Sequence, residues 1–326
     1  LGVALADDFP LIGCCAVQCN TTCDGSLMGN GIEARSFKIP TFQLAVPIRH
    51  RQESVQEYAA EEVVNAIHFI EEQTGEKFDW DAFFKSMKRF NAETEEFLEW
   101  MEISKTDYPQ VMGVTLALYR YGVYQAAGGR NQAFLDMDKK LTKMALDAYK
   151  SKEMAAKEYR HRAMTWGVQA AYYTALPIWL LNCWGVVTIA DMLSMVSTEM
   201  VNTEDKHQAM LDLAYLYENM IMRNRSNGGY ETGVEALWRF CEMFNIDIVI
   251  MYVHMGCKSM SGYHGLFEEE ARKHGIHLIW VTHNLMCPED GTRRDMRTEI
   301  NRYMRTVFRE EPLDPSLEDF DDSKSW

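Results

Sequence analysis

The sequence predicts an α/β fold made of two Rossmann-like parallel-sheet segments with a large helical insertion between them. Short apolar runs rich in β-branched residues occur near the start of the chain and again in its second half. Each run is followed by a loop and a helical pattern. Between these parts, apolar residues recur at helical spacing. Strands that alternate with helices are typical of parallel sheets, because parallel strands need a crossover connection.

The first α/β segment is short. Residues 10–17 predict a buried strand, and residues 39–46, IPTFQLAV, predict a second one. The intervening DGSLMGNGIEARSF predicts a Gly-rich turn and the start of a helix. Strand, helix and strand at this spacing indicate one parallel βαβ unit.

Long helices are predicted next. Ser54 and Glu57 have the spacing of a capping box, which marks a helix start, and Gly75 lies just past the end of the apolar stripe that follows. A second helix is predicted from Asp79, and helical patterning continues over residues 111–157.

The second α/β segment contains four candidate strands, at residues 163–168, 185–189, 247–254 and 277–282, with helices at about 232–244 and 294–308. We therefore expect four parts, with an acidic, loosely ordered tail at the end. They are residues 1–50 (the C-terminal part of a first α/β domain), 51–158 (helical), 159–312 (second α/β domain) and 313–326 (tail).

Composition and charge exclude some classes of function. The 326-residue chain has a formal charge of −15, which makes it a poor partner for nucleic acid. The most apolar stretch, residues 175–190, is too short and too interrupted to span a membrane. Without a visible secretory signal, the eight cysteines predict a reducing, cytoplasmic setting. The first residues, LGVALADDFP, suggest that an N-terminal segment is missing.

Two cysteines stand at equivalent places. Cys23 and Cys257 each follow a candidate parallel strand and precede a helix, so both are expected at the carboxyl edge of a sheet, where α/β proteins bind ligands. Thiolates suit iron–sulfur clusters or zinc. Cys15, Cys19 and Cys23 are spaced by four, which matches neither a zinc ribbon nor a ferredoxin. Cys14, Cys183 and Cys241 are expected to be ordinary buried residues without a ligand role. The role of Cys287 is open.

The segment CNTTCDGSLMGNGIEARSFKIPTFQLAVP and the later HMGCKSMSG resemble the 2-hydroxyacyl-CoA dehydratase and benzoyl-CoA reductase family over most of the chain. The resemblance implies that Cys23 and Cys257 ligate a [4Fe-4S] cluster, with Cys19 beside Cys23 as a further candidate ligand. The family's acidic residue and proline around WGVQ are replaced by Trp166 and Gln169. The identity of the substrate therefore does not follow from the resemblance.

The resemblance also implies an activity and partners. A separate activator that hydrolyses ATP would pass an electron to the cluster, which would reduce the carbonyl of a CoA thioester to a ketyl radical and eliminate water. The alternatives are a benzoyl-CoA reductase-type subunit that dearomatises an aryl-CoA, and a non-catalytic subunit that relays electrons or acts as a scaffold. A homologous second subunit is expected.

Charged and polar groups near the two cysteines are candidates for binding the thioester. Arg49 and Arg51 follow a strand end and could bind the CoA phosphates, and arginines 160, 162, 293 and 294 are further candidates, although solvated surface charge is favoured for all of them. Gly25 could let backbone amides approach a cofactor. Beside Cys257, three side chains could form hydrogen bonds or transfer a proton: His254, Ser259 and Ser261. Gly262 would leave space for a bound group.

Overall fold

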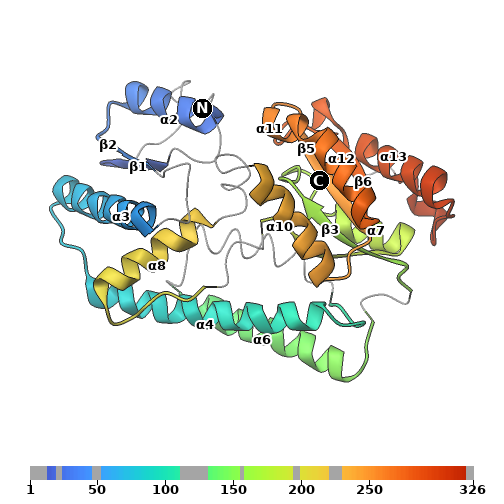
Figure 1. Ribbon diagram of the computed structural model, residues 1–326, viewed down its shortest axis with the longest axis horizontal. Helices are drawn as coiled ribbons and strands as arrows, with labels where there is room; N and C mark the ends of the chain where they lie inside the picture. Colours follow the sequence, from blue (N-terminus) through green and yellow to red (C-terminus); the bar gives the residue numbers. More distant parts are fainter. Residues whose placement is uncertain are drawn as a thin grey trace. The chain divides into compact units, whose positions relative to one another are not determined.

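The computed structural model describes residues 13–19, 24–45, 53–110, 131–154, 158–193, 199–219 and 230–320. The chain forms two compact units, each assembled from separate stretches of sequence (Figure 1). Unit 1 contains residues 1–91 and 197–233, and unit 2 contains residues 92–196 and 234–326. Both units contain parallel strands and helices, which confirms the predicted α/β class.

Unit 1 contains the predicted parallel βαβ unit. Strand β1 (Ala16–Cys19) pairs in parallel with β2 (Thr41–Leu44), and helix α2 (Asp24–Phe37) connects them. The strand begins later than predicted, so Cys14 and Cys15 precede it. The expected Gly-rich turn is wrong, because the segment from Asp24 onward is helical.

The core of unit 1 lies between helices. Helix α3 (Glu53–Thr74) packs on α8 (Lys206–Glu218), with aromatic residues from the start of α4 (Trp80–Ser104) against them. Gly75 ends α3 at a φ of 75°, as its position predicted. The predicted capping box is wrong, because α3 already includes Ser54; Glu57 instead lies 3.5 Å from His207 of α8. The predicted start of α4 is confirmed, because the Asp79 carboxylate accepts a 2.9 Å hydrogen bond from the Ala82 amide.

Among the described residues of unit 2, four parallel strands form one sheet in the order β4-β3-β5-β6. All four were predicted to within three residues. Their bounds are β3 His161–Trp166, β4 Val186–Asp191, β5 Ile248–His254 and β6 His277–His283. β4 is buried along its whole length and β5 over its first five residues, as expected for apolar strands covered on both faces.

Helices cover both faces of this sheet (Figure 1). On one face, α7 (Leu176–Trp184) and α13 (Arg293–Tyr303) pack against alternate strand residues that include Ile248, Ile250 and Tyr252. On the other face, α10 (Tyr230–Met243) and α12 (His264–His274) pack, through contacts such as Cys241 with Met164 and Phe267 with Trp280. Unit 2 is therefore doubly wound.

The strand order sets the position of the topological switch point. The chain leaves β3 toward β4 on one side and leaves β5 toward β6 on the other, so the order reverses between β3 and β5. The carboxyl ends of such a strand pair border the crevice in which doubly wound proteins bind ligands. Trp166 ends β3 and His254 ends β5.

The predicted loose tail is wrong for residues 313–320. The Leu313 amide donates to the Cys183 carbonyl at 2.7 Å, and the buried Trp179 indole donates to the Leu317 carbonyl at 2.8 Å. The Asn301 side chain donates to the Glu318 carbonyl at 2.9 Å. Donors on α7 and α13 that are buried or half-buried need acceptors, and this segment supplies them.

None of the described helices combines the length and the apolarity that crossing a bilayer requires.

Gly167 is predicted to be essential for stability. It follows β3 at a φ of 101°, and a Cβ there would lie 2.3 Å from the Tyr252 carbonyl oxygen. Gly167→Ala should reduce the free energy of unfolding by about 2 kcal/mol or more, since it adds backbone strain and a steric clash. Gly265→Ala is the matched control, because a Cβ at that position meets nothing within 4 Å. Urea unfolding of both variants measures the difference, and equal stabilities would contradict the prediction.

Candidate cofactor site at the carboxyl edge of the second sheet

Cys257 lies immediately after β5, at the start of a short helix. Its amide donates a 2.8 Å hydrogen bond to the His254 carbonyl and closes a tight turn. Helix α11 (Lys258–Gly262) begins directly afterward, with Cys257 in the N-cap position. The side chain is half-buried and makes no capping hydrogen bond. The thiol therefore belongs to the loop at the switch point, where the sequence predicted it.

Two histidines end adjacent strands at this edge. His254 of β5 and His283 of β6 are register partners in the parallel pair. The Nδ1 atom of His254 lies 3.4 Å from the His283 carbonyl oxygen. Because a carbonyl only accepts, Nδ1 carries the proton and donates it, which leaves Nε2 with a free lone pair in the neutral ring.

His283 and Tyr252 support His254 from the interior. The His283 side chain is fully buried, and burial lowers its pKa, so the ring is neutral. The Tyr252 ring packs edge-on against it, with ring centroids 5.7 Å apart, and burial raises the pKa of the Tyr252 hydroxyl. The sequence analysis missed both residues, although a histidine at the end of each of two predicted strands was a usable signal.

Glycine at position 256 leaves space for the His254 ring. A Cβ on Gly256 would lie 3.1 Å from Nε2 of His254, which is closer than ordinary contact. By contrast, a Cβ on Gly262 would meet nothing within 4 Å. The space that the sequence analysis expected beside Gly262 is therefore open, and the constrained glycine is Gly256.

The two serines of α11 differ in environment. The Ser259 hydroxyl oxygen is buried and has no hydrogen-bond partner among the described residues. Ser261 is exposed, and its hydroxyl donates a 3.1 Å hydrogen bond to the Cys257 carbonyl. A buried polar atom without a partner is costly, so Ser259 is the better candidate for contact with a bound group.

The other cysteines have varied surroundings. Cys183 and Cys241 are buried, and burial raises the pKa of each thiol to about 12, which confirms them as core residues. Cys14 is exposed, so its expected burial is wrong. The Cys287 thiol lies 2.9 Å from the Glu289 carboxylate, which raises its pKa. The half-buried Cys19 thiol contacts the Tyr217 hydroxyl within unit 1.

The segment from Arg160 to Arg162 lies at the start of β3 and has a structural role. Arg162 lies at the start of β3 and donates to the carbonyls of Ser104, Thr106 and Phe244 at 2.7–2.9 Å. Arg160 pairs with Glu310 at the same end of the strand. This amino edge is opposite to the Cys257 loop. Near the start of α13, Arg294 forms an exposed ion pair with Asp319. The expected surface charge is confirmed for Arg160 and Arg294, which form ion pairs, and is wrong for Arg162, which is half-buried and bonded to backbone carbonyls.

Several predicted site residues lie outside the described residues, namely Cys23, Arg49 and Arg51. Gly25 is exposed in the first turn of α2. The strand–turn–helix segment of unit 2 brings together the remaining candidates His254, Cys257, Ser259, Ser261 and Gly262. Among the described residues, no three histidine, cysteine or acidic side chains form a metal-binding group.

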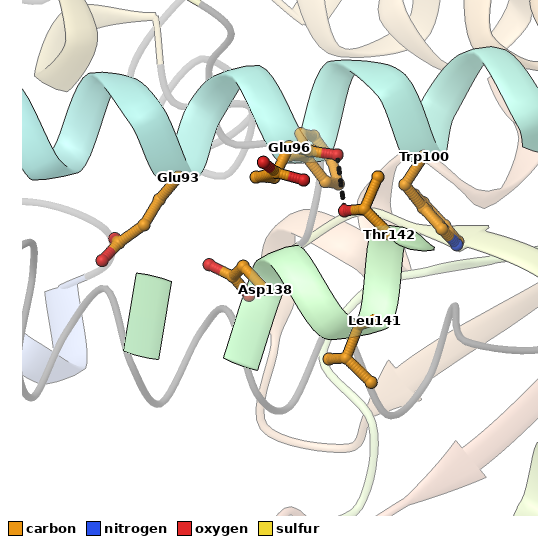
Figure 2. Close-up of a pocket in the computed structure, with 7 residues that line it drawn as sticks. Glu93, Glu96, Trp100, Asp138, Leu141 and Thr142 are labelled. Carbon is orange, nitrogen blue, oxygen red and sulfur yellow. Dashed lines mark hydrogen bonds between the residues drawn. The ribbon is translucent and has the colours of Figure 1, made fainter. Parts of the chain in front are cut away.

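Away from this edge, described residues line a small and a larger cavity. Figure 2 shows Glu93 of α4 and Asp138 of α6 (Gln132–Lys150) facing a space between these helices, where the Thr142 hydroxyl donates to the Glu96 carbonyl. Its volume of about 10 Å³ has room for roughly one water. A larger cavity of about 270 Å³ in unit 1 is lined by residues of α3 and α8, including Glu57 and His207.

The fold and this edge define unit 2 as a doubly wound α/β unit with a cysteine in its switch-point loop. Residues 1–303 match the family model HGD-D, 2-hydroxyglutaryl-CoA dehydratase, D-component. The chain therefore belongs to this family, which confirms the resemblance seen in its cysteine segments. A comparison with curated proteins found no match.

The contrast between the two serines gives a stability prediction. Ser259→Ala should leave the unfolding free energy of the cofactor-free protein unchanged or raise it by about 1 kcal/mol, because it removes a buried hydroxyl without a partner. Ser261→Ala should lower it by roughly 0.5 kcal/mol, since one hydrogen bond is lost. Urea titrations of both variants provide the test. A larger loss for Ser259→Ala would show that its hydroxyl is already satisfied within the fold.

Proposed function

We propose that this chain is the subunit of a 2-hydroxyacyl-CoA dehydratase that holds a [4Fe-4S] cluster through Cys257, together with Cys23 and Cys19. Family membership supports the dehydratase assignment. The position of Cys257 supports the role of this residue, because its half-buried thiol follows β5 at the switch point and takes no part in capping α11. The resemblance of the CNTTC segment to the family's cysteine segments supports the ligand roles of Cys23 and Cys19.

The residues around Cys257 fit such a group. A thiolate is a suitable ligand for iron, and the hydroxyl of Ser259 is a buried donor that needs an acceptor. The absence of a side chain at Gly256 leaves space beside the turn. When bound, the cluster would supply an electron to the thioester carbonyl, while the protein provides orientation and excludes water.

The substrate in this proposal is a CoA thioester. Ser259 and Ser261 are the candidates for donating hydrogen bonds to its oxygens, and His254, through the lone pair of Nε2, is the candidate for accepting a proton. Gly25 and Gly262 would let the backbone come close to the bound groups. Arg49 and Arg51 remain candidates for the CoA phosphates, to which guanidinium groups bind in a bidentate manner.

The partners in this proposal are a homologous second subunit and an ATP-hydrolysing activator that donates the electron. Two alternatives remain. A benzoyl-CoA reductase-type subunit would consume electrons and reduce an aryl-CoA ring, whereas a relay or scaffold subunit would have no turnover at its own site. The groups around Cys257 are exposed or half-buried. This favours a site that is accessible to substrate rather than a closed relay site.

Cys257→Ser is predicted to lower the iron and sulfide content of the anaerobically purified complex and to abolish dehydration of 2-hydroxyacyl-CoA. Serine replaces the thiolate with a poor iron ligand at nearly the same volume. Cys287→Ser is the matched control, because this cysteine follows the neighbouring strand β6 but contacts Glu289. It should retain iron and activity.

The assay would contain the activator and ATP and would offer 2-hydroxyacyl-CoA and aryl-CoA substrates in parallel. Turnover of the hydroxyacyl thioester alone supports the dehydratase, and turnover of the aryl thioester alone supports the reductase. Full iron content in Cys257→Ser would contradict the proposed ligand.

A further inference from the structure

A histidine at the amino edge of the sheet in unit 2 bridges two carboxylates. His161 is the first residue of β3, and its side chain is only 12% exposed. Its Nδ1 atom lies 3.0 Å from the carboxylate of Asp247, which precedes β5, and its Nε2 atom lies 2.9 Å from the carboxylate of Glu310, which lies beyond α13. An ionised carboxylate only accepts hydrogen bonds, and an imidazole donates from both nitrogens only when it is protonated. Both contacts are therefore hydrogen bonds only while His161 is charged.

The surroundings of His161 favour this charged form. Burial by itself would lower the pKa of the imidazole, because it disfavours a charge. The hydrogen bonds and the negative charges of Asp247 and Glu310 outweigh burial, so the pKa of His161 is raised above its ordinary value.

An arginine shares one of these carboxylates. The Arg160 guanidinium lies 3.4 Å from the Glu310 carboxylate and donates a 2.8 Å hydrogen bond to the Glu311 carbonyl, and it also lies 3.6 Å from the exposed Glu158. Arginine stays charged far above neutral pH, so this pair is present whether or not His161 is protonated. The pair is partly exposed to solvent, and an ion pair of this kind contributes little on its own.

A second histidine lies at the same edge without touching the bridge. The ring of His277, from β6, packs on Phe308, with ring centroids 4.4 Å apart, and His161 packs on the same Phe308 ring at 4.5 Å. The Nδ1 atom of His277 lies 3.1 Å from the Tyr303 hydroxyl. Of these two histidines, His161 is the one whose charge acts directly on the carboxylates.

Glu310 begins the segment of residues 310–320, which packs on α7 and α13. After the bridge to His161, the Leu313 amide donates to the Cys183 carbonyl at 2.7 Å. At the far end, the Arg305 guanidinium donates two hydrogen bonds of 2.6 and 2.7 Å to the Glu318 carboxylate. The segment is therefore attached at both of its ends, and the attachment at its beginning contains a group that titrates near neutral pH.

We propose that His161 is a pH-sensitive switch, whose charged form holds the beginning of segment 310–320 against unit 2 and whose neutral form releases it. A neutral imidazole has one N–H, so it loses one of the two hydrogen bonds and the charge that attracts both carboxylates. Asp247 also accepts a 2.8 Å hydrogen bond from the Arg162 amide and stays in place, so Glu310 is the partner that leaves. This inference goes beyond the proposed function and does not depend on it, because this edge is opposite to the Cys257 loop.

The direction of the effect follows from the raised pKa of His161. The stabilisation is complete below the pKa of histidine in an unfolded chain, about 6.5, and is lost as the pH rises through the raised pKa of the docked form. Linkage also sets its size. The equilibrium constant for release should grow by up to about tenfold for each pH unit between the pKa values of the docked and released forms.

The test is hydrogen exchange of the full chain, purified anaerobically and measured by mass spectrometry from about pH 6 to about pH 9, with the intrinsic effect of pH on exchange removed. The reporter is the peptide that contains the Leu313 amide. His161→Gln keeps a hydrogen-bonding side chain that cannot be charged, and Glu310→Gln tests the same bridge should that variant fail to fold. His277→Gln is the matched control, because this histidine lies at the same edge and contacts Tyr303.

In the wild type and in His277→Gln, protection of this peptide should fall as the pH rises. This dependence should be absent in His161→Gln and weaker in Glu310→Gln. NMR of the ¹³C-histidine-labelled chain should show that one of its nine histidines titrates above the ordinary range, with a signal that is missing in His161→Gln. Protection that is independent of pH in the wild type, or that keeps its pH dependence in His161→Gln, would overturn the inference. Loss of the dependence in His277→Gln alone would assign the switch to His277 and overturn it as well.

Discussion

The parallel pairing of β3 with β5 is the constraint on which the site of unit 2 depends. These strands pair from Ala163 with Ile248 to Trp166 with Met251, and the chain leaves them in opposite directions. The two strands stay close beyond their paired residues, because any side chain at position 167 would clash with the Tyr252 carbonyl. This contact fixes the end of β5, and with it the turn that carries His254 and Cys257.

Rigid and open parts meet at this edge. Behind the turn, Tyr252 and His283 are buried in an apolar interior that holds both rings neutral. In front of it, Gly256 and Ser261 are exposed and Cys257 is half-buried. A redox group needs ligands with fixed positions and a face that a substrate can reach, and a strand end followed by a short helix provides both.

The sequence predicted the parts of this arrangement that are encoded locally. Apolar β-branched runs identified β5 and β6, and the place of Cys257 after β5 followed from the order of elements. The importance of His283 depends on the register between β5 and β6, and that of Gly256 on the orientation of the His254 ring; neither follows from the sequence pattern alone. The order of residues 313–320 depends on buried and half-buried donors of α7 and α13, which an acidic composition does not show. The two units likewise combine distant segments.

The central claim is that the loop after β5 binds iron through Cys257. Anomalous diffraction at the iron absorption edge, from anaerobic crystals of the chain with its partner component, tests it most directly. Our account predicts an iron peak within bonding distance of the Cys257 sulfur. Iron bound only by other cysteines, with the Cys257 thiol packed against protein atoms, would contradict the account.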